Sequence, residues 1–198
     1  MSIVVEHDKR RKDILEKSLD VFVDEGFEDA TFQKIADRCG ITRTTLYIYF
    51  KNKKEIFTYS IKQLLQDVEA DITLTEQQKD LHCADKLIKV LSLIVDRLEE
   101  NQRLLQVILN YLLYLSKSET NPETRVRRRT IRLRHIITGM VLAGIKKGEL
   151  PPVNVKTLND LLYGFLECAI FRLSVLHHPS VSQIKENITL AVEALRRN

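Results

Sequence analysis

The residues with the most specific chemistry lie together between positions 41 and 57, where the sequence reads ITRTTLYIYFKNKKEIF. Tyr47, Tyr49 and Phe50 stand here among three threonines and four basic residues, with Glu55 as the only acid. Hydroxyl groups, phenols and cations at this density suit hydrogen bonds to phosphate oxygens and to the edges of nucleic-acid bases. A short helix cannot bury all of these side chains, so some of them remain available for that chemistry.

Two short helices joined by a glycine turn are expected to position this stretch. Thr31 is a favourable N-cap for a helix over about residues 32–39, whose apolar residues recur at helical spacing. Gly40 can adopt the positive φ of a sharp turn, because it has no side chain to clash. Thr42 can cap a second helix that ends near Tyr49. Two short helices around such a turn form the helix-turn-helix pattern.

The second of these helices is expected to have an inner and an outer face. Leu46 can pack inward, whereas Arg43, Thr44 and Tyr47 point outward. Thr45 lies at the edge between the two faces. The free N–H groups at the N-terminus of this helix can also donate to a phosphate. The outer face therefore offers donors of several kinds to a nucleic acid.

Basic residues are concentrated in the same region. From position 34 to position 54 the sequence has six basic residues and one acid, whereas residues 1–60 contain 11 of each. The net charge of the whole chain is only +4. The local distribution, rather than the total, is thus the electrostatic pattern of a DNA-binding surface.

The remainder of the chain predicts an all-helical protein. A first helix is expected over about residues 9–25, with Gly26 at its end. Its buried face is expected to carry Leu15, Leu19 and Phe22, flanked by Ile14 and Ser18. No stretch shows the period-two alternation of a strand, and all four prolines lie beyond residue 121. The periodicity indicates about nine helices in total.

The sequence also suggests where the chain divides. The polar segment Thr73 to Asp80 (TLTEQQKD) is expected to join an N-terminal domain, residues 9–60, to a helical domain over residues 73–198. Residues 158–176 are apolar nearly all round, which is more than one packing face requires. The last two helices are therefore expected to be covered on their second side by another subunit.

Composition argues against several other classes of protein. The longest apolar run, residues 104–115, is too short to cross a bilayer, which needs about 20 residues. Cys39, Cys83 and Cys168 are far apart and suit buried packing in the reducing cytoplasm rather than disulfides or zinc. No Ser/His/Asp constellation, glycine-rich phosphate loop or paired metal ligands are evident. We expect no enzyme activity, cofactor, metal or membrane insertion.

The segment GFEDATFQKIADRCGITRTTLYIYFKNKKEIF resembles the N-terminal DNA-binding domain of the TetR family of bacterial transcriptional regulators. The resemblance is carried by the succession IA, G and TLYxYFxNKxxIF, and it covers about residues 9–60, with the helix-turn-helix at about 31–50. It implies that the second short helix enters the major groove. For the rest of the chain, it implies only a helical architecture whose final helix pair forms a dimer bundle.

The resemblance assigns DNA contacts to seven side chains. Those implied near base edges are Arg43, Thr44 and Thr45. Those implied on phosphates are Tyr47, Tyr49 and Lys53, and Thr31 is implied on the DNA backbone. Two positions depart from the family's usual pattern: Thr44 stands where Gly or Ala is common, and Ala30 stands where Thr is common.

These expectations combine into a ligand-responsive transcriptional regulator, most simply a repressor. A homodimer would bind a near-palindromic operator, and a small, mostly hydrophobic effector in the helical domain would release it. The alternative is a DNA-binding partner protein that acts without a small-molecule effector. An enclosed pocket among the middle helices favours the first hypothesis, and a solid core favours the second.

Six arginines between positions 125 and 134 (RVRRRTIRLR) leave three interpretations open. They can form the exposed face of an amphipathic helix. They can bind an anionic effector beside an apolar pocket. They can also pair with a partner subunit or with nearby acids.

Overall fold

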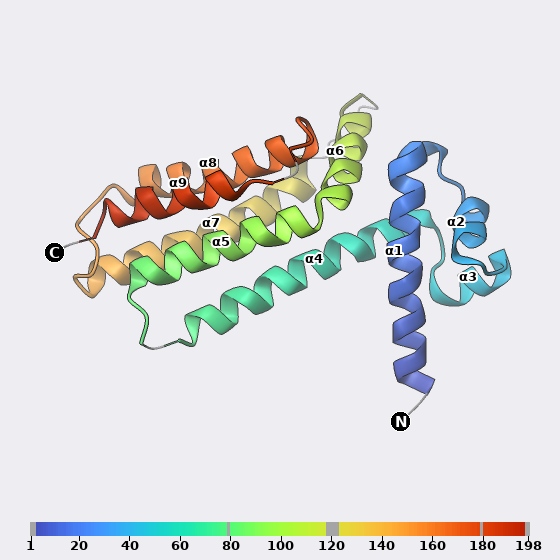
Figure 1. The fold of residues 1–198 in the computed structure, drawn as a ribbon, viewed down its shortest axis with the longest axis horizontal. Coiled ribbons are helices and arrows are strands. Elements are labelled where there is room, and N and C mark those ends of the chain that lie inside the picture. The colour runs from blue at the N-terminus through green and yellow to red at the C-terminus, as the bar shows by residue number, and fades with distance from the viewer. Residues whose placement is uncertain (1–2, 79, 118–122, 179, 197–198) are drawn as a thin grey trace. The chain divides into compact units, whose positions relative to one another are not determined.

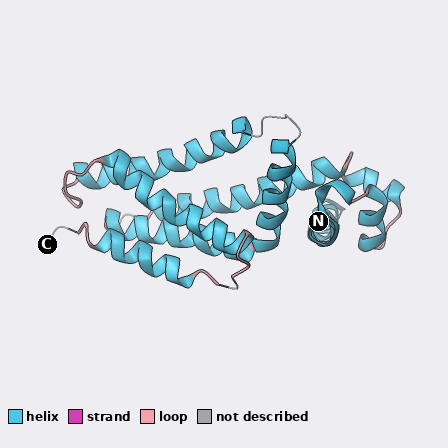
Figure 2. Ribbon diagram, turned by 90° about the horizontal axis from the view of Figure 1, so that it is seen from above, coloured by secondary structure: helices cyan, strands magenta, loops and turns pink. Residues whose placement is uncertain are grey.

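The computed structural model describes residues 3–78, 80–117, 123–178 and 180–196, and side-chain surroundings for residues 6–78, 80–113, 131–178 and 180–196. The described residues form nine helices and no strand, which confirms the predicted all-α class (Figures 1 and 2). The helices are α1 (Ile3–Asp29), α2 (Phe32–Cys39), α3 (Arg43–Tyr49), α4 (Lys53–Glu76), α5 (Cys83–Glu100), α6 (Gln102–Lys117), α7 (Glu123–Lys146), α8 (Val155–Ser174) and α9 (Ser182–Glu193).

The chain divides into two compact units. Unit 1 comprises Met1–Gln66 and Arg103–Ser118, and unit 2 comprises Asp67–Gln102 and Glu119–Asn198. The first part of α4 belongs to unit 1 and the second part to unit 2. The polar segment that begins at Thr73 is helical as far as Glu76, so α4 continues into the stretch expected to be a joint.

Unit 1 is built around α1. The side chains of Ile14, Ser18 and Phe22 are buried, and the Ser18 hydroxyl donates to the Ile14 carbonyl. Leu15 and Leu19, expected on the buried face, are only partly covered. The buried stripe is thus rotated by about one residue from the predicted one, because α1 packs along the line of Ile14 and Ser18.

A cluster of aromatic rings forms another part of the core of unit 1. Gly26 has φ 80° and interrupts α1, as expected, but helical backbone resumes as far as Asp29. This break places Phe27 against the rings of Phe57 and of Tyr111 from α6, with centroid separations of 5.0 and 4.5 Å. Residues distant in sequence therefore share one core in this unit.

Unit 2 has α5 at its centre. This helix packs against α7, α8 and α9, and the four lie side by side in Figure 1. Leu87, Val90, Leu91 and Val95 on α5 are completely buried. α8 buries one face and leaves a second, largely apolar face exposed.

The start of α5 is tied to the loop that follows α7. The Glu149 carboxylate accepts a hydrogen bond from the backbone N–H of Cys83, which lowers the pKa of that carboxyl. Burial, followed by the hydrogen bond to Glu149, raises the pKa of the Cys83 thiol. Cys83 is therefore a packing residue that is poor in reactive thiolate at neutral pH.

The arginines between positions 125 and 134 are only partly described, since the side chains of residues 123–130 lie outside the described ones. Arg132 pairs with Glu69 at 2.8 Å, and Arg134 pairs with Asp160 and lies over the ring of Tyr163. For these two arginines the structure favours pairing with nearby acids. Among the described residues, no helix is long and apolar enough to cross a membrane.

Candidate DNA-binding site

The two short helices of unit 1 begin and end as the sequence predicts. The Thr31 hydroxyl accepts from the backbone N–H of Lys34 at 3.2 Å, and the Thr42 hydroxyl accepts from that of Thr45 at 3.0 Å. Gly40 ends α2 with φ 65°, in the left-handed region that favours glycine. These caps confirm the helix-turn-helix geometry from α2 to α3.

The inner face of this motif is completely buried. Ile35 and Ala36 on α2 and Leu46 on α3 have no exposed surface, and Phe50, directly after α3, is 1% exposed. A helix of seven residues is unstable by itself. Its position therefore depends on these four side chains and on the Thr42 cap.

The outer face of α3 carries a polar pair beside an apolar residue. Tyr47 and Ile48 are 49% and 69% exposed. The Arg43 guanidinium donates to the Tyr47 phenol oxygen at 3.1 Å, and Thr44 is exposed on the same short helix. The Tyr47 ring also packs on the ring of Phe32 from α2, with centroids 4.8 Å apart. Arg43 and Tyr47 are thus held together on the exposed surface.

Thr45 and Tyr49 are only partly exposed. The Thr45 hydroxyl shares a hydrogen bond of 2.8 Å with the Thr42 hydroxyl at the N-terminus of α3. The Tyr49 ring stacks on the imidazole of His7, with centroids 4.7 Å apart. His7 lies near the start of α1, outside the region that carries the sequence motif. Sequence reasoning missed this residue, since nothing local to His7 indicates the stack.

Lys53 is the residue whose placement differs most from the expectation. Its ammonium donates to the carbonyls of Phe27, Glu28 and Ala30 at 2.8, 2.6 and 3.0 Å. These carbonyls lie at the end of α1, where a helix leaves its last carbonyls without internal partners. All three N–H donors of the ammonium are used within unit 1. The structure therefore gives Lys53 an internal role that the sequence pattern did not indicate.

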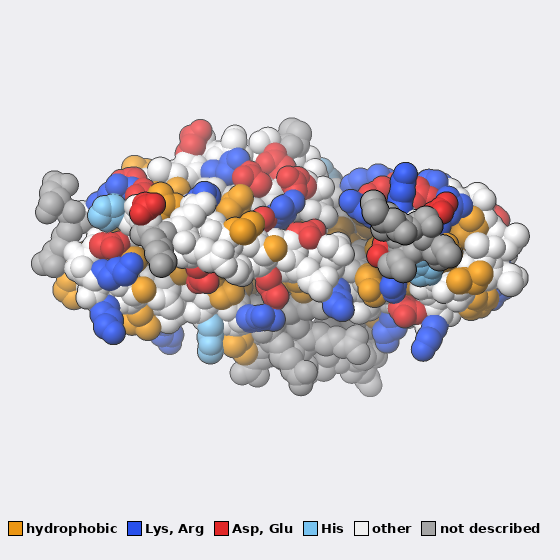
Figure 3. All heavy atoms as spheres, turned by 90° about the horizontal axis from the view of Figure 1, so that it is seen from below, with side chains coloured by type: hydrophobic (Ala, Val, Ile, Leu, Met, Phe, Trp, Pro, Cys, Tyr) orange, Lys and Arg blue, Asp and Glu red, His pale blue; other side chains and the backbone are white. Residues whose placement is uncertain are grey.

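The predicted concentration of positive charge is also partly neutralised. Lys34 pairs with Glu25 at 2.5 Å, and Arg38 pairs with Asp24 at 3.0 Å. Both acids lie on α1, which packs against α2. On the face shown in Figure 3, basic and acidic side chains are interspersed rather than separated.

The cations of unit 1 thus fall into two groups. Lys34 and Arg38 are tied to acids and Lys53 to carbonyls, whereas the exposed Arg43, Lys51 and Lys54 form no ion pair with any described residue. No described group of three or more His, Cys, Asp or Glu side chains could hold a metal ion. The geometry supports recognition of a polyanion by α3 and its neighbours.

Residues 14–59 match the family model for bacterial regulatory proteins of the tetR family. This match places a DNA-binding domain of the TetR family in the chain. It is 26% identical to the fatty acid metabolism regulator protein of Bacillus subtilis over 161 residues, which are 78% of each chain. It is 29% identical to the HTH-type transcriptional regulator PksA of Bacillus subtilis over 110 residues, about half of that regulator's length (53%) and 56% of this chain.

Solved structures of TetR type show the same fold. The ketosteroid transcriptional regulator KstR2 of Mycobacterium tuberculosis superimposes with a TM-score of 0.72 over 96% of each chain, at 16% identity. The TetR family regulator PfmR of Thermus thermophilus gives a TM-score of 0.70 over 93% of this chain and 99% of its own, at 19% identity. At these identities the likeness shows the fold alone. Together with the family match, it identifies the chain as a TetR-type transcriptional regulator and not an enzyme.

Proposed function

We propose that this TetR-family regulator is a repressor that binds a palindromic operator as a homodimer and is released by a small, mostly hydrophobic effector. The observation that carries the DNA-binding part is the Arg43–Tyr47 pair, exposed on a short helix whose other face is buried. Side chains fixed on a rigid helix can be presented to a major groove at little entropic cost. We also propose that the protein acts in the cytoplasm.

The exposure of each residue supports a division of roles at the DNA. Arg43 and Thr44, both exposed, are proposed to approach base edges, with Thr45 at the margin because its hydroxyl is bonded to Thr42. Tyr47, which is exposed, and Tyr49, which is partly exposed, are proposed to contact phosphates.

Of the two remaining predicted contacts, Thr31 is kept in the proposal and Lys53 is not. Thr31 is exposed at the start of α2 and is proposed to contact the DNA backbone, although its hydroxyl also caps that helix. Lys53 is left out, because a phosphate contact would require the ammonium to leave the carbonyls at the end of α1.

The outer face of α8 and α9 supports the proposed dimer. Leu161, Phe171 and Val175 are 51%, 52% and 42% exposed on or directly after α8, and Leu190 is 73% exposed on α9. Exposed apolar side chains gathered on one pair of helices are typical of a face that another chain covers. We propose that a second copy packs its α8 and α9 against this face.

The names of relatives support the proposed effector. Names of relatives refer to fatty acid metabolism and to ketosteroids, which are apolar compounds. The hollow described in unit 2, about 440 Å³, lies on the surface of α5 and is lined by Leu93, Asp96, Arg97, Glu99 and Glu100.

A selection of random duplexes with the purified protein tests the proposed function. We expect enriched sequences with two half-sites related by near-palindromic symmetry, spaced by about one helical turn or a multiple of it. Half-sites without a symmetric partner would contradict the dimer. No enrichment over the input library, at low and at moderate salt, would contradict sequence-specific binding itself.

A further inference from the structure

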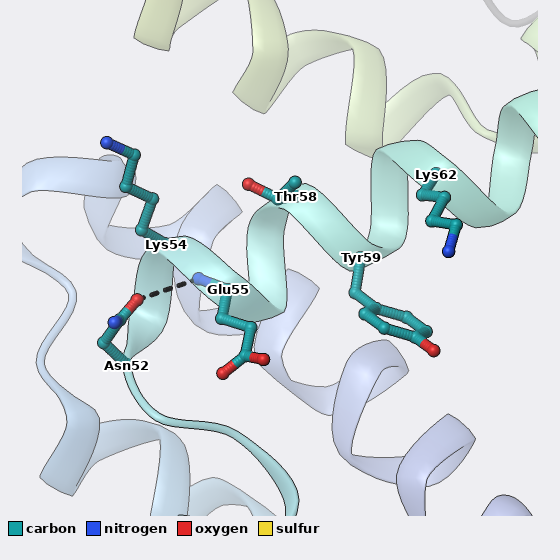
Figure 4. Close-up of a pocket in the computed structure, with 6 residues that line it drawn as sticks. All are labelled: Asn52, Lys54, Glu55, Thr58, Tyr59 and Lys62. Carbon is teal, nitrogen blue, oxygen red and sulfur yellow. Dashed lines mark hydrogen bonds between the residues drawn. The ribbon is translucent and has the colours of Figure 1, made fainter.

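A hollow of about 290 Å³ lies along the first turns of α4 in unit 1. None of the residues that line it is among the seven to which the family resemblance assigns a DNA contact. The lining side chains are Asn52, Lys54, Glu55, Thr58, Tyr59 and Lys62. Figure 4 shows them in succession along α4, with the Tyr59 ring between Glu55 and Lys62.

Arg11 from α1 reaches the same place. Its guanidinium lies 3.8 Å from the centroid of the Tyr59 ring and 5.0 Å from that of Phe50. The Arg11 Nε–H group is buried and has no hydrogen-bond partner among the described residues. The Lys62 ammonium lies 5.6 Å from the centroid of the same Tyr59 ring. Two cations thus meet one partly exposed phenol ring, an arrangement that an added anion would stabilise.

The one acid that lines the hollow, Glu55, is already hydrogen-bonded within the protein. The Glu55 carboxylate accepts from the backbone N–H of Lys51, and the backbone N–H of Glu55 donates to the Asn52 side chain. Asn52 thus caps the first turn of α4, and the Glu55 carboxylate reaches back to the residue before the cap. Within the described part of the chain, Arg11, Lys54 and Lys62 form no ion pair. Lys54 and Lys62 therefore border the hollow, and Arg11 reaches its tyrosine ring from α1.

Ring contacts link the hollow to the end of α3. His7 stacks on Tyr49, the last residue of α3, and Arg11 lies one helical turn further along α1. Phe50 follows Tyr49 directly and meets the Tyr59 ring edge-on, with centroids 6.1 Å apart. A duplex strand that passes Tyr49 would therefore meet Arg11 and the hollow next, one helical turn of about 5.4 Å away.

We propose that Arg11, Lys54 and Lys62 form a second phosphate-binding surface around this hollow, which holds the backbone of the same duplex whose bases α3 reads. This inference rests on the proposed function, and it extends the DNA contacts from the helix-turn-helix to the first turns of α1 and α4. Contacts of this kind add affinity without sequence preference.

The test compares two double variants that remove equal charge from unit 1. Lys54→Gln/Lys62→Gln removes two exposed cations of the hollow. Lys17→Gln/Lys34→Gln removes two cations that are already paired with Asp13 and Glu25. Affinity for the selected operator and for a scrambled duplex is measured over a range of salt concentrations, after circular dichroism has shown that each variant retains the helical content of the wild type.

We expect the hollow variant to bind both duplexes roughly ten-fold more weakly, with the slope of log affinity against log salt reduced in size by about 3.6, as for two lost phosphate contacts in each of the two bound subunits. The control variant keeps the wild-type slope. Equal slopes for the hollow variant and the wild type overturn this inference and leave the proposed function standing. A wild-type protein that binds neither duplex overturns the proposed function instead.

Discussion

Two surfaces of this molecule expose large side chains, and they do so in opposite chemical settings. On α3, Tyr47 and Ile48 are flanked by Arg43 and by threonine hydroxyls. On α8 and α9, the exposed large residues include Leu161, Phe171 and Leu190, which are apolar. A hydrated polyanion suits the first surface, because its donors stay hydrogen-bonded on binding. A second copy of the chain suits the other, because only burial removes apolar area from water.

The two surfaces also differ in what holds them. α3 has seven residues and relies on Leu46, Phe50 and the Thr42 cap for its position. α8 has 20 residues, an Asn154 cap and a continuous buried face against α5 and α7. Changes around α3 are therefore expected to alter the position of this helix and its affinity for DNA directly, whereas changes on the outer face of α8 are expected to alter dimerisation first and operator affinity through it.

The largest expected effect lies at α8. Leu161→Glu/Phe171→Glu places two charges on the proposed dimer face, and we expect dimer affinity to fall at least a thousand-fold, about 4 kcal/mol, because a buried unpaired charge is costly. Sedimentation velocity at micromolar concentration should show a dimer for the wild type and a monomer for the variant. Leu74→Glu is the control, since Leu74 is a similarly exposed leucine on α4 (62%) outside this face. A variant that remains dimeric would rule out this face as the interface.

The next effect lies at α3. Tyr47→Ala removes the phenol that accepts from Arg43, and we expect operator affinity to fall about ten- to a hundred-fold while the helical content is unchanged. Ile48→Ala serves as the control, because Ile48 is more exposed than Tyr47 yet offers no hydrogen bond. Fluorescence anisotropy on the selected operator measures both. Equal affinities for the two variants would remove the role assigned to Tyr47.

Variants of Lys53 test whether this cation stabilises unit 1 from within or contacts DNA. Lys53→Met leaves three carbonyls at the end of α1 without this donor, and we expect it to lower the free energy of unfolding by about 1–3 kcal/mol. The salt dependence of DNA binding should keep the wild-type slope, since no phosphate contact is lost.

Lys53→Arg is the informative companion variant. Arginine keeps the charge and binds phosphate well, but its planar guanidinium does not match an ammonium that donates to three carbonyls. We expect urea unfolding of the arginine variant to resemble that of the methionine variant. If arginine instead restores binding and the methionine variant loses about 1.8 from the salt slope, one contact in each subunit of the bound dimer, Lys53 is a phosphate contact.

Local signals account for what the sequence predicted well. The caps at Thr31 and Thr42 and the turn at Gly40 involve partners within three or four residues, so periodicity and residue type were sufficient. The buried stripe of α1 was misplaced by about one residue, because it depends on which way the helix packs. The net positive charge of the helix-turn-helix surface is also smaller than predicted. The acids that pair with Lys34 and Arg38 lie 9 and 14 residues away, and only the packing of α1 brings them close.

Long-range partners account for what the sequence did not reveal. The carbonyls bound by Lys53 lie 23 to 26 residues before it, and His7 reaches Tyr49 from near the start of α1. Tyr111, on α6, completes the aromatic cluster around Phe27. Side chains of these types were visible in the sequence, but no spacing rule connects residues that only the fold brings together.

The smallest expected effect concerns Glu149, in the loop between α7 and α8. Its folded-state pKa is lowered first by the hydrogen bond from the Cys83 backbone, so its charged form stabilises the native state. That contribution is complete above the ordinary pKa of 4.5 and disappears as pH falls through the lower folded value. Glu149→Gln keeps an acceptor for the same N–H but removes the charge. We expect the variant to be about 1 kcal/mol less stable at pH 7 in urea unfolding, and the difference to shrink as pH falls below 4.5. If the stability difference between the wild type and Glu149→Gln does not change with pH, the charge of Glu149 does not stabilise the start of α5.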